Sequence, residues 1–200
     1  PSFDQKAVTE DIEVVENNLN YRIDKKLFQK VGYYYDHREN RKRAAALLEK
    51  LEGDFERGLD LFCYVGSWGL NLLKSKCKTI EFVDQGDFEK NISENLELNG
   101  FKAQGKFHRG NVFEYLKSKK NEKLKFDVIN SDPPAFCKSR RDKHKAYDGY
   151  VKLHRGCISL LRSGGVLLAG SCTQYIGHDE FQKSVRTRCF DDAFFLLAGL

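Results

Sequence analysis

The sequence predicts an α/β fold in which helices cover both faces of a doubly wound, mainly parallel β-sheet. From residue 58 to residue 200, short apolar runs alternate with longer segments of helical periodicity. This alternation is typical of strand–helix units that build a parallel sheet. Glycines and acidic residues follow several of the apolar runs. In a sheet of this kind, ligands bind at the carboxyl ends of the strands, so these residues are the first candidates for a functional site.

Six apolar segments are predicted to form the strands of this sheet. They are residues 58–65, 79–84, 105–111, 125–132, 166–172 and 193–200. The segments between them predict helices, because their apolar residues recur at three- and four-residue intervals. The helices are expected at residues 67–76, 88–100, 112–119, 150–165 and 178–190, and the paired glycines at 164–165 are expected to close the fourth of them.

The first 36 residues have a different pattern, which predicts a β-hairpin. Apolar residues alternate over residues 12–24, on both sides of an Asn-Asn pair, as they do in two paired strands. A helix is then expected at residues 38–52. We therefore divide the chain into residues 1–36, a hairpin linker or the end of a central domain, and residues 37–200, the α/β domain, which we expect to be truncated at its C-terminus.

The composition indicates a soluble, cytoplasmic protein. No apolar run is long enough to span a bilayer, and the N-terminus has no secretory signal. The six cysteines form neither CxxC pairs nor zinc-ligand spacings, so we expect free thiols and no metal. The net charge of +5 is modest but clustered at residues 37–43 and 137–145. Such clusters are compatible with a polyanionic partner, although a solvated helix or loop explains them equally well.

A glycine turn and an acidic residue predict an adenosine-binding site after the first two strands. Gly66 and Gly69 form a GxxG pattern, and Tyr64 stands where a dinucleotide fingerprint would have its first glycine. Asp84 ends the second strand, 24 residues after Asp60, which suits an acceptor for ribose hydroxyls; capping of the next helix is the alternative. Because the turn lacks a complete cradle for a pyrophosphate, S-adenosylmethionine fits better than a dinucleotide.

The fourth and fifth strands place an acid and a thiol at the same edge of the sheet. Asp132 ends the fourth strand, and two prolines that follow it fix the backbone. Cys172 ends the fifth strand. The alternatives are an ordinary turn at Asp132 and a small buried hydrophobe at Cys172. If the two strands are neighbours, both side chains face the crevice that holds the cofactor.

Seven segments, in order, resemble the bacterial 23S ribosomal RNA cytosine-C5 methyltransferases that carry an N-terminal PUA domain. They are GYYYDHRENR (32–41), LDLFCYVGSWGLN (59–71), FVDQ (82–85), NLELNG (95–100), FDVINSDPPAFCKS (126–139), GY (149–150) and GGVLLAGSCT (164–173). The resemblance covers roughly residues 10–185. It implies a class I methyltransferase (Rossmann-like) fold, with residues 37–200 as the S-adenosylmethionine-dependent domain. An RNA-binding domain upstream and a further strand after residue 200 are also expected.

The resemblance assigns roles to individual residues. Residues expected to bind the cofactor are Arg38, Asp60, Tyr64, Gly66, Asp84, Gln85, Asn111 and Asp132. Cys172 would be the nucleophile, with Asp132 beside it. The basic residues Lys138, Arg140 and Arg141 would approach phosphates of large-subunit ribosomal RNA, whose target base would be flipped into the pocket. A homodimer is an assembly that the sequence leaves open.

Methylation of cytosine at C5 gives the acid and the thiol a chemical purpose. A thiolate that adds to C6 makes C5 nucleophilic, and a carboxyl group at N3 stabilises the intermediate. The thiol is therefore expected to have a lowered pKa. The sequence departs from the family at His37, where a glutamine is usual, at Asn111, where an acid is usual, and at Cys137, a rival thiol where a small residue is usual.

Two other functions stay open. A methyltransferase of the same fold that acts on another base, such as guanine N7, needs no thiol, so the presence of Cys172 favours the cytosine reaction over it. A non-catalytic RNA-binding module would keep only the fold, and the presence of Asp84, Asp132 and Cys172 argues against it.

Overall fold

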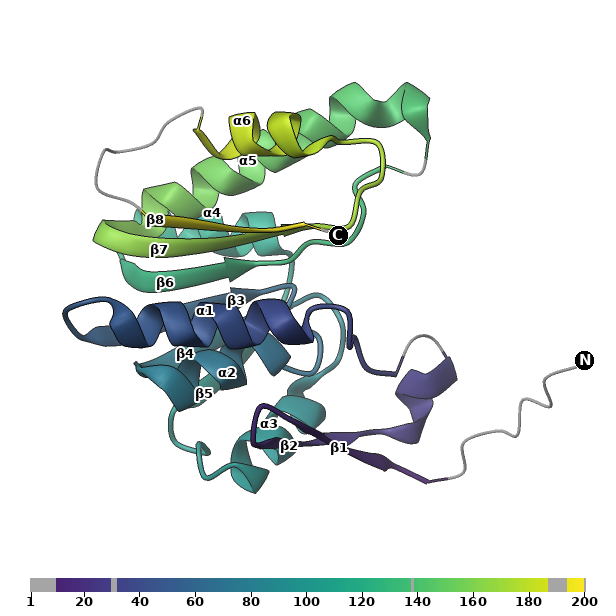
Figure 1. The fold of residues 1–200 in the computed structure, drawn as a ribbon, viewed down its shortest axis with the longest axis vertical. Helices are drawn as coiled ribbons and strands as arrows, with labels where there is room; N and C mark the ends of the chain where they lie inside the picture. The colour runs from purple at the N-terminus through teal and green to yellow at the C-terminus, as the bar shows by residue number, and fades with distance from the viewer. Residues whose placement is uncertain (1–9, 30–31, 138, 187–193, 200) are drawn as a thin grey trace, which may run out of the picture.

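The computed structural model describes residues 10–29, 32–137, 139–186 and 194–199, and within them it has the predicted α/β architecture. A six-stranded parallel sheet has the order β5-β4-β3-β6-β7-β8 (Figure 1). Its strands are β3 (Phe55–Leu61), β4 (Cys77–Asp84), β5 (Gly105–Arg109), β6 (Phe126–Ser131), β7 (Leu161–Ser171) and β8 (Phe194–Gly199). This order confirms that the strands carrying Asp132 and Cys172 are neighbours.

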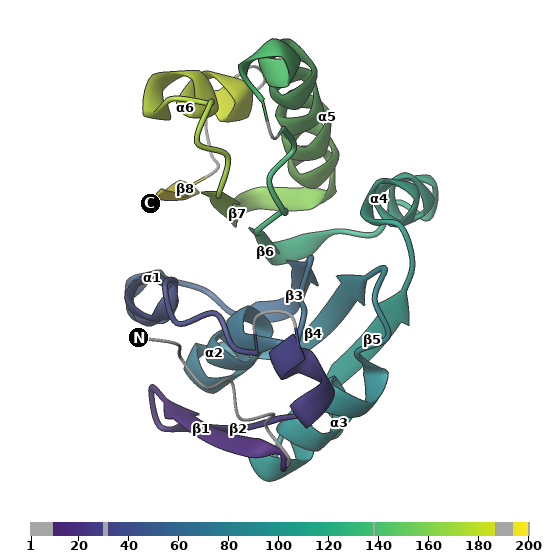
Figure 2. The ribbon, with the colours of Figure 1, turned by 90° about the vertical axis from the view of Figure 1, so that its right-hand side faces the viewer.

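Helices cover both faces of the sheet, as expected for a doubly wound fold (Figure 2). The hairpin, α1 (Arg38–Lys50), α2 (Ser67–Ser75) and α3 (Glu89–Leu98) pack on one face, and α4 (Val112–Asn121), α5 (Lys143–Leu160) and α6 (His178–Arg186) pack on the other. Two short 3-10 helices, η1 (Lys25–Gln29) and η2 (Arg140–Asp142), lie in connections.

The central strand β6 divides the hydrophobic core into two layers. All six of its residues are buried, and successive side chains point to opposite faces. Val128 therefore packs in the cluster with the hairpin and α1 to α3, whereas Ile129 packs in the cluster with α4 to α6. A strand buried on both faces is characteristic of a parallel sheet and holds the residues at its carboxyl end rigidly.

The predicted hairpin is confirmed as β1 (Ile12–Glu16) and β2 (Leu19–Ile23), two antiparallel strands. Asn17 and Asn18 turn the chain with φ angles of 53° and 57°, in the left-handed region that asparagine tolerates. The hairpin packs firmly on the α/β domain, because the buried Glu16 carboxylate accepts two 2.7 Å hydrogen bonds from Arg41 of α1 and one of 3.0 Å from Tyr33 Oη. The division between residues 36 and 37 stays a prediction.

The predicted closure of a helix by the paired glycines is wrong. Helix α5 begins at Lys143, seven residues before its predicted start, and ends at Leu160. Residues 161–165 belong to β7, in which Leu161 pairs with Phe126 and the register shifts before Val166. Gly164 adopts φ 72°, and a Cβ on Gly165 would lie 3.1 Å from the Asp127 carbonyl oxygen. The two glycines therefore permit the change of register in β7. Of the last predicted helix and strand, residues 187–193 and 200 lie outside the described residues.

In the part of the chain that the structure describes, no helix has the length and apolarity needed to cross a membrane.

Candidate active site

The strand order reverses between β3 and β6, and the candidate site lies at the carboxyl ends of the strands around this point. Strand β3 pairs with β4 on one side and β6 on the other, so the chain leaves the first strand for one edge of the sheet and returns to build the other edge. Ligands of doubly wound sheets bind at such a reversal. The predicted site residues Tyr64, Asp84, Asp132 and Cys172 follow or end β3, β4, β6 and β7.

The turn between β3 and α2 is strained and closely packed. Phe62 and Tyr64 have φ angles of 59° and 49°, which are uncommon for residues with large side chains and concentrate at functional sites. Gly66 follows with φ 83° and forms the N-cap of α2. The backbone N–H groups of Ser67 and Trp68, the first two residues of this helix, lack partners within the helix, whereas that of Gly69 donates to Asp60. The turn thus places backbone N–H donors where a ligand would lie.

Asp60 lies beneath this turn and is fully buried. Its Oδ2 accepts a 2.8 Å hydrogen bond from the Gly69 amide, and its Oδ1 accepts one of 2.8 Å from Asn130 Nδ2. Burial raises the pKa of this carboxyl group to about 7. Because no part of the side chain reaches the surface, the geometry favours a positioning role, in which Asp60 holds α2 against β6, over the predicted contact with the cofactor.

Asp84 ends β4 and joins the two loops that flank the turn. Its Oδ2 accepts a 3.1 Å hydrogen bond from the Tyr64 amide and its Oδ1 one of 2.8 Å from the Gly86 amide. The carboxylate is partly exposed, and each oxygen can accept a further hydrogen bond. Helix α3 begins after Phe88 without a side-chain cap, so capping does not explain Asp84. Gln85, also predicted to bind the cofactor, is exposed directly beside it.

Asn111 has a structural task that the sequence comparison did not predict. Its side-chain oxygen accepts hydrogen bonds from the amides of Phe113, at 2.9 Å, and Glu114, at 3.3 Å, and so caps α4. Asparagine is a preferred residue for this role. Because this oxygen already accepts two hydrogen bonds, the side-chain amide nitrogen, a donor, is the atom left for a ligand, and the predicted contact of Asn111 with the cofactor stays a prediction.

Asp132 follows β6 and lies among groups from three elements. Its Oδ2 accepts a 3.1 Å hydrogen bond from Trp68 Nε1 of α2, and His37 Nε2 is 3.8 Å from the same oxygen. A Cβ on Gly170 of β7 would lie 2.7 Å from Asp132 Oδ1, so the neighbouring strand leaves room for this side chain. Burial raises the pKa of Asp132.

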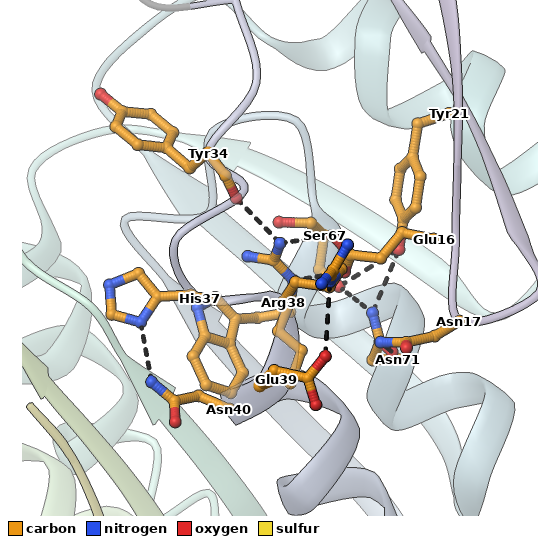
Figure 3. Close-up of polar contacts among 12 residues, drawn as sticks. Glu16, Asn17, Tyr21, Tyr34, His37, Arg38, Glu39, Asn40, Ser67 and Asn71 are labelled. Carbon is orange, nitrogen blue, oxygen red and sulfur yellow. Dashed lines mark hydrogen bonds and ion pairs between the residues drawn. The ribbon is translucent and has the colours of Figure 1, made fainter. Parts of the chain in front are cut away.

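His37 and Trp68 are site residues that sequence reasoning missed. His37 is buried, and its Nδ1 is 3.4 Å from Asn40 Nδ2 at the start of α1 (Figure 3). Its ring lies 6.0 Å from that of Trp68. The sequence signalled His37 only as a departure from the family, and its proximity to Asp132 depends on how α1 packs against α2.

Cys172 is half-buried, and its thiol lies 3.5 Å from the Pro133 carbonyl oxygen, in the loop that follows Asp132. Burial, and then the Asp132 carboxylate, raise the pKa of this thiol. The expectation of a lowered pKa is therefore wrong for this structure, because the partner beside the thiol is an acid rather than a cation. Asp132 and Cys172 stand at the ends of paired strands, as expected, and their sharing of one cofactor crevice stays a prediction.

Tyr150 of α5 braces the segment that carries Cys172. Its hydroxyl group lies 2.9 Å from Ser171 Oγ and 2.8 Å from Thr173 Oγ1, and the Phe136 amide donates to Thr173 Oγ1 at 3.2 Å. The two neighbours of Cys172 are thereby tied to α5. Cys172 itself turns toward the loop after Asp132. Sequence reasoning noted Gly149-Tyr150 within the resemblance but not this role.

The rival thiol, Cys137, belongs to the core cluster around α5 and is only 6% exposed. Cys63, Cys77 and Cys157 are also buried, free thiols. Among the cysteines that the structure describes, Cys172 is thus the one with substantial exposure at the strand ends. The geometry favours it over Cys137 as a nucleophile.

Among the residues predicted to bind the cofactor or contact RNA, Arg38, Arg140 and Arg141 lie at the surface. Arg38 is 58% exposed and forms an ion pair with Glu39, 3.4 Å away, rather than with a residue of the crevice (Figure 3). Its predicted role in closing the cofactor pocket stays a prediction. Arg140 and Arg141 are exposed in η2, between β6 and α5. Lys138 lies outside the described residues.

Comparisons with known proteins place the chain in a family. The family model of S-adenosylmethionine-dependent methyltransferases matches residues 5–193. The chain therefore belongs to the S-adenosylmethionine-dependent methyltransferase family, and S-adenosylmethionine is the cofactor of the site. This finding confirms the cofactor predicted from the glycine turn and Asp84.

Curated relatives and solved structures agree with this assignment. Ribosomal RNA large subunit methyltransferase I of Aeromonas hydrophila is 35% identical over 92% of this chain and 46% of its own length. The protein of the same name from Shewanella denitrificans is 32% identical over 89% of this chain and 44% of its own. A SAM-dependent methyltransferase from Agrobacterium tumefaciens has the same fold, with a TM-score of 0.73 at 18% identity over 93% of this chain and 61% of its own. The chain thus spans about half the length of the curated relatives it matches.

The residues at the strand ends fit the cofactor. Asp84 offers two carboxylate oxygens, each with a free acceptor position, to a ribose. Gly66 lets the turn pack closely on the core, because a Cβ there would lie 3.1 Å from Phe82 Cε1 and would be strained at φ 83°. The aromatic rings of Tyr64 and Phe88 lie 4.9 Å apart, in the loops that follow β3 and β4, and offer apolar surface to an adenine. These residues would hold S-adenosylmethionine on the β3–β4 side of Asp132.

Proposed function

We propose that the protein containing this chain methylates C5 of a cytosine in large-subunit ribosomal RNA through a covalent bond to Cys172. One observation carries the proposal: a half-buried thiol and a carboxyl group stand at the tips of neighbouring strands, and Trp68 of the helix after the cofactor turn donates to that carboxyl group. The names of the curated relatives support ribosomal RNA as the substrate. A cytoplasmic location and a homodimer stay predictions.

The acid and the thiol of this pair can exchange a proton. A thiol next to a carboxylate ionises with difficulty, and the pKa values of Asp132 and Cys172 are both raised. A thiolate and a carboxylate side by side would repel each other. Transfer of the thiol proton to Asp132 avoids this repulsion, because the carboxyl group becomes neutral as the thiolate forms. The reaction therefore begins with a proton moving from Cys172 Sγ to Asp132 and leaves a nucleophile beside an acid.

The two groups then act on opposite sides of the cytosine ring. The Cys172 thiolate forms a bond to C6, the C5=C6 π electrons shift toward N3, and Asp132 donates its proton to N3. S-adenosylmethionine supplies the methyl group that C5 receives. A base then takes the proton from C5, the double bond re-forms, N3 gives up its proton and the thiolate leaves. His37, 3.8 Å from Asp132 Oδ2, is a basic side chain beside this pair.

Methylation of another base, such as guanine N7, is the second candidate. The raised pKa of Cys172 favours it, because a thiol that stays protonated is no nucleophile. In that reaction, Asp132 would hydrogen-bond an N–H group of the flipped base, and Cys172 would only pack against it. A non-catalytic RNA-binding module is the third candidate, and cofactor binding measured by calorimetry separates it from both enzymes.

The test uses the intact protein, S-adenosylmethionine and ribosomal RNA that contains 5-fluorocytidine. Fluorine at C5 cannot leave as a proton does, so the covalent RNA–protein adduct should accumulate and map to Cys172 by digestion and mass spectrometry. Cys172→Ala should abolish the adduct, and Cys137→Ala should keep it. An adduct on Cys137 would overturn the nucleophile, and ribosomal RNA methylation without any adduct would establish the second candidate.

A further inference from the structure

A groove runs between α4 and α5, on the surface away from the cofactor turn. It encloses about 380 Å³. Its floor is apolar, formed by Phe113 and Leu116 of α4 and by Gly156 of α5. A Cβ at Gly156 would lie 2.9 Å from Leu116 Cδ1, so glycine permits the two helices to approach closely here.

Four basic side chains border this groove, two from each helix. Lys117 and Lys120 come from α4, and Lys152 and Arg155 come from α5. All four residues are exposed, and within the described part of the chain none of them forms an ion pair with an acidic side chain. Lys152 Nζ lies 5.1 Å above the ring of Phe113. Glu114 also lines the groove, so the four cations and this one carboxylate leave an excess of positive charge above the apolar floor.

The groove is connected to the active site through the loop that follows Asp132. Phe113 lies 6.4 Å from Phe136 of that loop, measured between ring centroids. The exposed Arg140 and Arg141 precede the first residue of α5. Since α5 continues from there to Lys152 and Arg155, basic side chains occur from the mouth of the crevice to the groove.

We propose that the groove between α4 and α5 binds the sugar-phosphate backbone of the RNA substrate at a distance from the target base. Phosphates suit the four cations, which outnumber the single Glu114 carboxylate, and riboses or unstacked bases suit the apolar floor. Contact there would fix the orientation of the RNA while the flipped base reaches Cys172. The proposal rests on RNA being the substrate, but not on which base is methylated.

Charge removal tests the groove with a matched control. Lys117→Gln/Lys120→Gln/Arg155→Gln removes two lysines and one arginine from the groove and leaves the Lys152–Phe113 contact intact. Lys50→Gln/Arg57→Gln/Lys106→Gln is the control variant, which removes the same charges from exposed positions outside the groove and outside both basic clusters. Both variants of the intact protein would be titrated with a transcript of large-subunit ribosomal RNA at several salt concentrations.

The groove variant should bind the transcript at least tenfold more weakly at 0.15 M salt. Its slope of log K against log salt should shrink by about 2 to 3, because roughly 0.7 to 0.9 is lost for each phosphate contact. Affinity for S-adenosylmethionine and the melting temperature should match those of the wild type. The control variant should retain RNA affinity; equal losses in both variants, or none in the groove variant, would overturn the proposal.

The outcomes separate this proposal from the proposed function. If RNA binding depends on the groove but no 5-fluorocytidine adduct forms, the groove proposal is supported and the cytosine mechanism is rejected. If the adduct forms equally well in the groove variant, only the groove proposal is rejected. Unchanged RNA affinity, together with lost affinity for poly-glutamate, would overturn the proposal in favour of an acidic protein partner.

Discussion

Asp132 and Cys172 come from neighbouring strands, and the Asp132 carboxylate makes the Cys172 thiol harder to ionise. Burial raises the pKa of both groups, and the Asp132 charge raises that of the thiol further. Trp68 Nε1 donates to Asp132 and favours its charged form, so the carboxylate is kept available as a proton acceptor. The pair is thus built for transfer of a proton within the site rather than for a thiolate at rest.

Asp132→Asn should lower the pKa of the Cys172 thiol, because the nearby negative charge is removed while the shape and the Trp68 hydrogen bond are kept. Alkylation of Cys172 by iodoacetamide, followed by mass spectrometry across pH 6 to 10, should therefore become faster at neutral pH. Methylation should fall by at least a hundredfold, because the proton acceptor is gone. The buried Cys137 provides the internal control and should stay unmodified. An unchanged or higher thiol pKa would show that Asp132 does not control Cys172.

The sequence could place the reactive residues but not their protonation. Asp84, Asp132 and Cys172 were found because each follows an apolar run, and a parallel sheet brings such ends together. The raised pKa of Cys172 depends on an acid 40 residues earlier in the chain and on the depth of burial. For the same reason, the full burial of Asp60 required the packing of α2 on β6, which no local pattern contains.

At the scale of elements, α5 and β7 are joined at the point where the nucleophile stands. Tyr150 bridges the hydroxyl groups of Ser171 and Thr173, so the direction of Cys172 is set by a helix that carries no reactive group. The start of α5 and the irregularity in β7 were mispredicted, because Lys143 to Gly149 lack helical periodicity and Gly164-Gly165 resemble a helix end. Both errors lie next to the site, where local signals and tertiary packing disagree.

Tyr150→Phe should release this brace without disturbing the cofactor. The loss of two hydrogen bonds to a buried hydroxyl group should lower the free energy of unfolding by about 1 to 3 kcal/mol. The yield of the 5-fluorocytidine adduct should fall about tenfold or more, while affinity for S-adenosylmethionine stays the same. Tyr147→Phe is the matched control, since Tyr147 is a partly buried residue of the same helix, packed on the same core cluster. Equal adduct yields in the two variants would contradict a positioning role for Tyr150.

At the scale of the whole molecule, two buried titratable groups act on stability in opposite directions. Asp60 has a pKa raised to about 7, so the folded state binds its proton more tightly than the unfolded state does. The stabilisation that Asp60 adds to the free energy of unfolding is complete below about pH 4 and is lost as the pH rises toward 7. His154, buried in α5, has a pKa lowered to about 4. The stabilisation that His154 adds to the free energy of unfolding is complete above about pH 6.5 and is lost as the pH falls toward 4.

Between pH 4.5 and 6.5, the opposite effects of Asp60 and His154 on the free energy of unfolding should nearly cancel in the wild type. Single substitutions should reveal each effect separately. His154→Gln leaves Asp60 unopposed, so relative to the wild type its free energy of unfolding should fall with rising pH, by at most about 1.4 kcal/mol per pH unit. Asp60→Asn leaves His154 unopposed, and its free energy of unfolding should rise over the same interval. Urea unfolding at half-unit pH steps measures both slopes, and all other groups contribute equally to the three proteins. Because the comparison uses slopes, a uniform loss of stability from either substitution does not affect it. Parallel curves for the three proteins would show that neither group is buried as the structure places it, and the packing of α2 on β6, which orients the cofactor turn, would then have to be revised.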